Sequence, residues 1–169
     1  MTGYSTEGWG DLFLAAAGAT AALSGLIFVG LSVNIRTVLD IDKQVGSNFL
    51  TGRAIEALVA LLSVLVISLV ALTPTIARGV LAAFILLTAA TSAISPVRAV
   101  LASRSQRQLT VATAWRLVTA TSLTLTLLAA GATLAAGHGG GLDWLPASFV
   151  LAVAVAAINA WILLVEILR

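Results

Sequence analysis

A small set of charged and amide side chains has the chemistry to bind an ion or a proton. Glu56 and Glu166 are carboxylates near the ends of long apolar runs, and Asn159 lies two helical turns deeper than Glu166. An ionised side chain at the centre of a bilayer costs at least about 2.5–3.5 kcal/mol, so such groups normally face water or neighbouring helices. Basic and amide side chains near the same run ends complete a candidate polar cluster, which consists of Asn34, Arg36, Arg53, Glu56, Arg98, Arg116, Asn159 and Glu166.

This polar cluster has two open interpretations. In the structural one, Glu56 and Glu166 pair with neighbouring arginines and hold the helix ends together. Arg53 precedes Glu56 by three residues, which places both on one helix face. In the functional one, the same charges form a vestibule for an ion, a proton or a partner protein. Asn159 fits the structural interpretation least well, because it is polar and deep in its apolar run.

Catalytic and cofactor-binding patterns are missing from the sequence. There is no Cys and a single His, His138, which excludes thiol chemistry and His-rich metal or haem sites. The run 138–141 reads HGGG and imitates the oxyanion loop of lipases, but no G-x-S-x-G nucleophile motif accompanies it. Phosphate-binding, zinc-protease and dinucleotide fingerprints are absent too. We therefore expect no enzyme activity, no metal and no cofactor.

The composition places these residues in a membrane protein. Of the 169 residues, 60% are hydrophobic and 9% are charged, whereas about 25% are charged in an ordinary soluble domain. So few charges cannot cover a water-soluble surface, which excludes a soluble enzyme. Nine Lys and Arg against seven Asp and Glu do not form a nucleic-acid-binding surface. The expected partner is the lipid bilayer, and no nucleic acid partner is expected.

Five apolar runs approach the roughly 20 residues that a helix needs to cross a bilayer. We predict an all-α integral membrane protein in which residues 1–169 form one bundle, with loops at 35–52 and 99–114. The third run is the shortest and either extends beyond Pro96 or kinks there. No Lys or Arg precedes the first run, so no cleavable signal peptide is expected. The predicted spans are 12–33, 54–72, 79–95, 115–136 and 145–168.

The distribution of basic residues predicts the orientation of this bundle. Most Lys and Arg lie between the first and second spans or between the third and fourth, and the segment 137–144 has none. Because positively charged loops stay in the cytoplasm, we predict an external N-terminus and a cytoplasmic C-terminus. The two basic segments hold Arg36, Lys43 and Arg53, and Arg98, Arg104 and Arg107.

Small residues recur at four-residue spacing in the first span. Such residues let two helix backbones approach closely in lipid, where packing replaces the hydrophobic effect. The contact is either with another helix of the same chain or with a second subunit, so a homo-oligomer formed through the first span stays open. The residues concerned are Ala17, Gly18, Ala21, Ala22 and Gly25.

Hydroxyl side chains form two stripes, one in the third span and one in the fourth. Such stripes line a narrow aqueous path or hydrogen-bond to helix backbones, and we favour the second interpretation because Ser and Thr are common in membrane helices. The stripes consist of Thr88, Thr91, Ser92 and Ser95, and of Thr119, Ser122, Thr126 and Thr133.

Two segments carry a resemblance to known proteins. The first comprises 10–13 (GDLF) and 17–35 (AGATAALSGLIFVGLSVNI), and the second is 159–167 (NAWILLVEI). These segments are similar to the two ends of an uncharacterised family of small bacterial multi-pass membrane proteins. The resemblance implies a multi-span bundle in the bacterial cell (inner) membrane, and it implies no activity.

These observations favour two functional hypotheses. The first is a small, oligomeric ion or proton channel or transporter that uses the polar cluster on its cytoplasmic side. The alternative is a non-transporting accessory or regulatory subunit of a larger membrane complex, with another membrane protein as its partner. Small size, missing catalytic motifs and two modest basic segments support the alternative.

Overall fold

The computed structural model describes residues 7–46, 49–103, 111–137 and 140–167 as a bundle of five long helices. After a short 3-10 turn at Glu7–Trp9, the helices are α1 (Gly10–Val45), α2 (Phe49–Ala71), α3 (Arg78–Ser103), α4 (Val111–Ala136) and α5 (Trp144–Ile167). Each is long and apolar enough to cross a membrane. The prediction of an all-helical, multi-pass protein with five such helices is confirmed to this extent.

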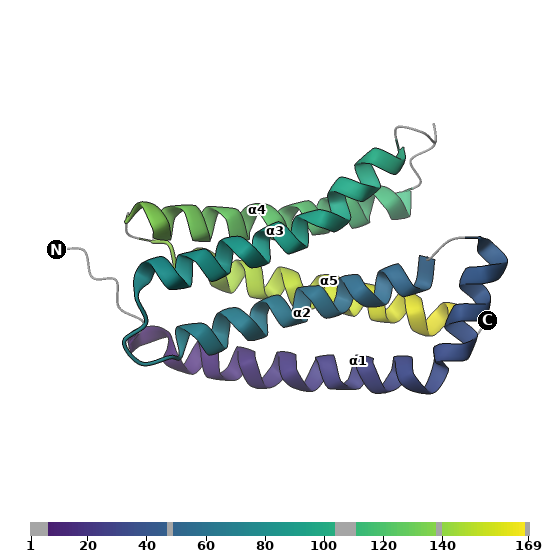
Figure 1. Ribbon diagram of the computed structural model, residues 1–169, viewed down its shortest axis with the longest axis horizontal. Coiled ribbons are helices and arrows are strands. Elements are labelled where there is room, and N and C mark those ends of the chain that lie inside the picture. The colour runs from purple at the N-terminus through teal and green to yellow at the C-terminus, as the bar shows by residue number, and fades with distance from the viewer. Residues whose placement is uncertain (1–6, 47–48, 104–110, 138–139, 168–169) are drawn as a thin grey trace.

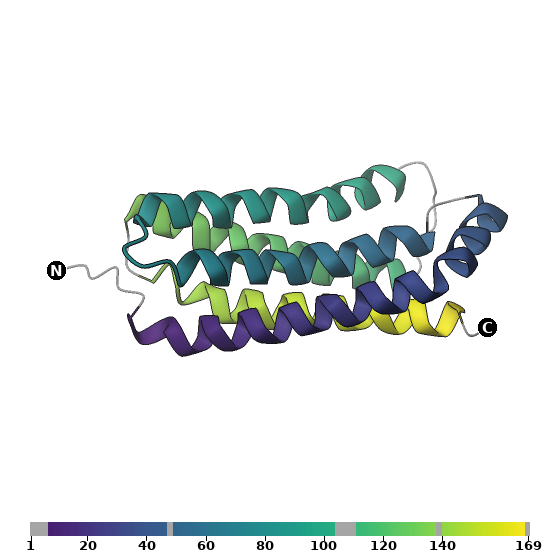
Figure 2. The ribbon, with the colours of Figure 1, turned by 60° about the horizontal axis from the view of Figure 1, so that its bottom comes forward.

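The five helices form three layers, with α1 on one side, α2 and α5 in the middle, and α3 and α4 on the other side (Figures 1 and 2). Within the described residues, α1 packs on α2 and α5 and does not reach α3 or α4. The start of α1 and the end of α5 lie at opposite ends of the bundle (Figure 1). We call these the N-terminal end and the C-terminal end of the bundle.

The half of the bundle nearer its N-terminal end is filled by the largest cluster of buried apolar side chains. Every helix contributes to it, and the rings of Phe13 on α1 and Phe149 on α5 meet edge to face at 6.2 Å. This cluster is the main apolar core of the described residues. The larger members are Phe13, Ile67, Leu81, Ile85, Leu127, Leu134, Leu145 and Phe149.

Helix α1 extends well beyond the predicted span 12–33. Its 36 residues would be about 54 Å long at 1.5 Å per residue, whereas the hydrocarbon core of a bilayer is about 30 Å thick. The last part of α1 turns across the C-terminal end of the bundle (Figures 1 and 2). There it buries Val38 against Leu50, Ala54 and Leu163. The predicted loop at 35–52 is therefore wrong, because 35–45 and 49–52 are helical.

Two local features mark the end of α1 and the start of α2. Gly46 adopts a left-handed conformation with φ of 67°, and its N–H caps α1 by donating to the carbonyls of Asp42 and Lys43. The Asp42 carboxylate reaches across the turn and accepts hydrogen bonds from the backbone N–H groups of Leu50 and Thr51 at 2.8 and 3.1 Å, and from the Thr51 hydroxyl at 2.6 Å. Asp42 thus satisfies N–H groups in the first turn of α2, which have no partner inside that helix.

Helix α3 contains the buried Pro96 and continues beyond it to Ser103. The predicted span 79–95 therefore extends rather than ends at the proline, and the predicted loop 99–114 is helical at both of its ends. Figure 1 shows α3 turning away from α2 toward the C-terminal end of the bundle. A proline removes one backbone hydrogen bond and crowds the preceding turn, which accounts for a change of direction there.

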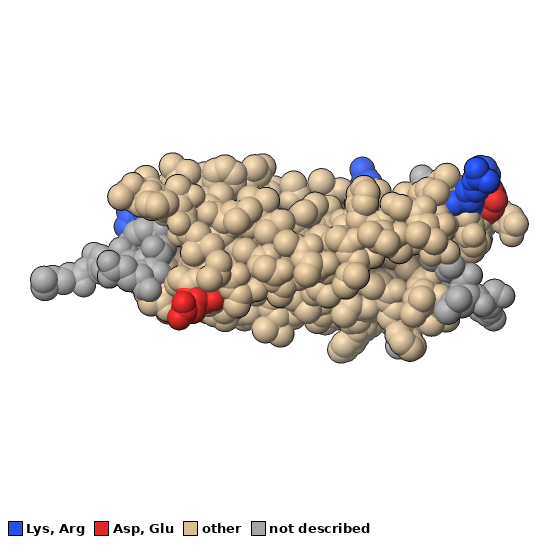
Figure 3. All heavy atoms as spheres, turned by 90° about the horizontal axis from the view of Figure 1, so that it is seen from below, with Lys and Arg blue, Asp and Glu red and all other residues tan. Residues whose placement is uncertain are grey.

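The surface between the two ends is largely uncharged. On the face shown in Figure 3, charged side chains gather near the two ends, apart from one basic patch at the upper edge. Large apolar side chains of α1 are exposed along this surface, among them Leu26, Phe28 and Val33. An apolar belt flanked by charges is the surface that a bilayer requires.

Candidate functional site

The centre of the site is a buried contact between α2 and α5. Arg53 Nη1 donates a hydrogen bond of 3.1 Å to Asn159 Oδ1, and both side chains are buried. Asn159 Nδ2 in turn donates to the Val155 carbonyl at 3.0 Å, which fixes the amide orientation. The ring of Phe49 lies 4.9 Å from the Arg53 guanidinium carbon and covers it by a cation–π contact. The structure thus brings together two predicted members of the polar cluster that are 106 residues apart in sequence.

Glu56 lies one turn after Arg53 on α2 and is also buried. It lines two neighbouring cavities, which also share Ala120 and Val155. The smaller one, of about 120 Å³, extends from Glu56 to Arg53 and Asn159, and we call it the side cavity. The larger one, of about 580 Å³, lies between α2, α3, α4 and α5, and we call it the main cavity.

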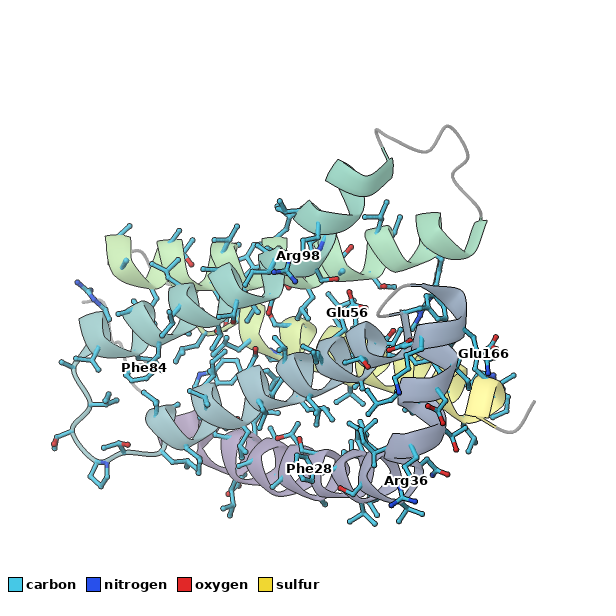
Figure 4. All side chains as sticks on the ribbon, turned by 45° about the vertical axis from the view of Figure 1, so that its right-hand side comes forward. Phe28, Arg36, Glu56, Phe84, Arg98 and Glu166 are labelled. Carbon is cyan, nitrogen blue, oxygen red and sulfur yellow. The ribbon has the colours of Figure 1, made fainter. Side chains whose placement is uncertain are left out.

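The main cavity has walls of different character. From α3 come the hydroxyls of Thr91, Ser92 and Ser95, followed by the guanidinium of Arg98. The α2 wall is apolar except for Glu56. Figure 4 shows Glu56 and Arg98 on neighbouring helices at a similar level of the bundle. Ligand sites in proteins usually combine apolar walls with a few placed polar groups in this way.

Most side chains of the two hydroxyl stripes bond to the backbone of their own helix. On α4, Ser122, Thr126 and Thr133 donate to backbone carbonyls within their own helix. Thr88 and Thr91 on α3 do the same. Ser92 behaves differently. This residue is buried and lines the main cavity, and its hydroxyl forms no hydrogen bond with the described part of the chain.

Comparison of the chain with protein-family models, curated proteins and solved structures finds no match. The family resemblance drawn from the two end segments therefore stays a prediction. The function has to be argued from the geometry of the site.

Among the described side chains of the polar cluster, Asn34, Arg36 and Glu166 line neither cavity. Figure 4 shows Arg36 on the far side of α1 and Glu166 at the end of α5, well beyond the level of Glu56. Asn34 is half-buried and donates to the Gly30 carbonyl of its own helix at 2.9 Å. Arg116 belongs to α4, but its side chain lies outside the described residues, as do Arg104 and Arg107 of the predicted basic segment.

The small residues of the first span mostly face outward. Ala17 is buried, whereas Gly18, Ala21, Ala22 and Gly25 are exposed. A Cβ atom added at Gly18 or Gly25 would meet nothing within 4 Å. Close packing within the chain therefore explains Ala17 and not the other four.

Neither the main cavity nor the capping role of Asp42 could be recognised in the sequence. The main cavity depends on how four helices diverge, and its apolar lining reads like any other membrane segment. The sequence pattern places Asp42 in a loop, because an Asp seven residues before the start of α2 does not match the usual capping position, at which the capping residue directly precedes the helix. Its pairing with Leu50 became visible only with the turn at Gly46.

Proposed function

We propose that this protein is a small multi-pass membrane transporter that binds its substrate in the main cavity and a proton at Glu56. The observation that carries this proposal is the position of Glu56, a buried carboxylate that lines both cavities. Ionisable groups inside membrane segments are expensive to bury and commonly mark ion or proton paths. In the predicted orientation, both cavities belong to the cytoplasmic half of a bacterial inner membrane protein.

The distribution of packing favours a transporter over an open channel. The main cavity lies in the half of the bundle toward its C-terminal end, and apolar side chains such as Phe13, Ile85 and Leu127 fill the other half. An ion channel needs a water-lined path through both halves. A site that is closed on one side matches a transporter, in which access alternates between the two sides.

Proton flux in liposomes tests this proposal. The purified protein is reconstituted with a pH-sensitive dye inside, and a potassium gradient with valinomycin supplies the driving force. We expect faster acidification than in empty liposomes, and we expect Glu56→Gln to reduce the rate at least tenfold. Glu166→Gln is the matched control and keeps the rate, because Glu166 lies apart from the cavities. Flux equal to that of empty liposomes, or flux unchanged by Glu56→Gln, would refute the proposal.

The outward face of α1 favours a second candidate, an accessory subunit that joins another membrane protein or a second copy of itself. Gly18 and Gly25 leave open space on that face, which lets another helix approach closely. A gentle-detergent pull-down followed by crosslinking tests it. Gly25→Leu should abolish the association, and recovery of the monomer alone from the unmodified protein would contradict this candidate.

A further inference from the structure

The main cavity reaches the side of the bundle as well as its interior. Two of its lining residues, Ile55 on α2 and Ile94 on α3, are 56% and 50% exposed. Both lie within helices that are apolar enough to cross a membrane. The rim of the cavity between α2 and α3 therefore faces lipid chains rather than water. A molecule that enters here comes from the membrane and has an apolar part.

The charged groups of the main cavity lie at one end of it. Glu56 and Arg98 lie about one to two turns from the ends of α2 and α3 at the C-terminal end of the bundle. Thr91 and Ser92 lie about two turns deeper along α3 than Arg98. The deepest part of the α2 wall is apolar, with Val59 and Ala60. The cavity thus changes from charged at this end to hydroxyl-lined on α3 and apolar on α2 toward the middle of the bundle.

The two charges have opposite sign and stand on different walls. A carboxylate on α2 and a guanidinium on α3 match a polar group that carries both an ammonium and an acidic function. Glu56 does not need to be without other contacts, because a carboxylate offers about four acceptor positions. The Ser92 hydroxyl, which is buried and forms no hydrogen bond with the described residues, supplies a further donor for the ligand.

We infer that the main cavity takes up a zwitterionic amphiphile from the lipid, between α2 and α3, with its ammonium at Glu56 and its acidic group at Arg98. The apolar chain of this amphiphile extends along Val59 and Leu123. The volume of about 580 Å³ lies within the range of about 300–1,000 Å³ that is usual for sites holding one small ligand. This inference rests on the proposed function and names the substrate class of the same site.

Binding of three probes with the same lauroyl or dodecyl chain length tests the inference. Lysophosphatidylethanolamine carries both charges, lysophosphatidic acid carries only the acidic group, and dodecylamine carries only the ammonium. Dissociation constants are measured for the protein in lipid nanodiscs. We expect the zwitterion to bind about tenfold more tightly than either singly charged probe, since one charge-assisted contact changes affinity by about that factor.

Variants assign each charge to its residue. Arg98→Gln should weaken both phosphate-containing probes about tenfold, and Glu56→Gln should weaken both ammonium-containing probes to the same degree. Arg36→Gln is the matched control and leaves all three constants unchanged, because Arg36 lies outside the cavity. Val59→Trp fills the apolar part and should abolish binding of every probe. Equal binding of the three probes, or a zwitterion affinity that Arg98→Gln leaves unchanged, overturns the inference.

Two further results separate this inference from the proposed function. Free phosphoethanolamine, which has the same polar group and no chain, should not bind; binding as tight as that of the lysolipid would overturn uptake from the membrane. The binding assay needs no gradient. Probe binding without proton flux therefore refutes the transporter and supports the ligand class, whereas proton flux without probe binding overturns the ligand class alone.

Discussion

Asp42 allows a sharp test of how the bundle is held together at its C-terminal end. Its carboxylate, on a residue that is 6% exposed, accepts three hydrogen bonds from the first turn of α2. Removing an N-terminal capping side chain costs about 0.5–2 kcal/mol, and leaving a buried donor without a partner costs about 1–3 kcal/mol. Because these contributions overlap, we expect Asp42→Ala to lower the free energy of unfolding by about 2–3 kcal/mol.

A matched control lies two residues away on the same helix. Asp40 carries the same charge, is exposed, and pairs with Lys43 across 3.3 Å at the surface. Exposed ion pairs contribute about 0–1 kcal/mol, so Asp40→Ala should lower the free energy of unfolding by less than about 0.5 kcal/mol. Asp42→Asn keeps one acceptor oxygen and should fall between these two variants.

Reversible unfolding by sodium dodecyl sulfate in mixed micelles provides the measurement, followed by far-ultraviolet circular dichroism. The comparison is the difference in unfolding free energy between Asp42→Ala and Asp40→Ala. If the two variants lose the same stability, the hydrogen bonds across the turn do not hold α1 to α2. The buried apolar contacts of Val38 would then be sufficient for that purpose.

Further predictions concern packing near the N-terminal end of the bundle. Phe13→Ala should lower the free energy of unfolding by about 3–5 kcal/mol, because a cavity replaces the buried ring, whereas Phe28→Ala at an exposed position of α1 should change it little. The same unfolding assay measures both, and equal losses would contradict the placement of these rings. Gly141→Ala should cost about 1–3 kcal/mol, because its Cβ would lie 2.9 Å from the backbone nitrogen of Leu134. Gly30→Ala, where nothing lies within 4 Å, should be neutral or stabilising, and a larger loss there would refute this reasoning.

The existence of the five helices was predictable because lipid imposes a simple rule on sequence. A segment that crosses a bilayer as a helix must satisfy its backbone N–H and C=O groups by hydrogen bonds within the helix, and it must carry apolar side chains over about 20 residues. The extension of α1 through Asp40, Asp42 and Lys43 was not predictable by this rule, because that part of the helix is polar and its hydropathy resembles that of a loop. The missing information was the capping contact with α2.

The sequence was sufficient to predict which polar residues could form a site, but not which of them meet in the folded bundle. Charged and amide side chains are rare in or near the apolar runs, so Glu56, Arg53 and Asn159 were recognisable as candidates. The structure places all three around the side cavity. Glu166 met the same criterion but lies elsewhere. Lipid-facing and buried positions are equally apolar in a membrane helix, so the sequence pattern does not tell which face of α2 or α5 turns inward.

The position of α5 has a consequence for the order in which the bundle forms during synthesis. Helices α1 and α2 form one antiparallel hairpin, and α3 and α4 form a second, each from neighbouring segments of the chain. Helix α5 is synthesised after both hairpins and packs against α2 of the first and α4 of the second. Because Asn159 is on α5, the buried Arg53 acquires this hydrogen-bond partner only after the four preceding helices have been synthesised. Until then, among the described residues, the two hairpins contact each other only through α2 and α3.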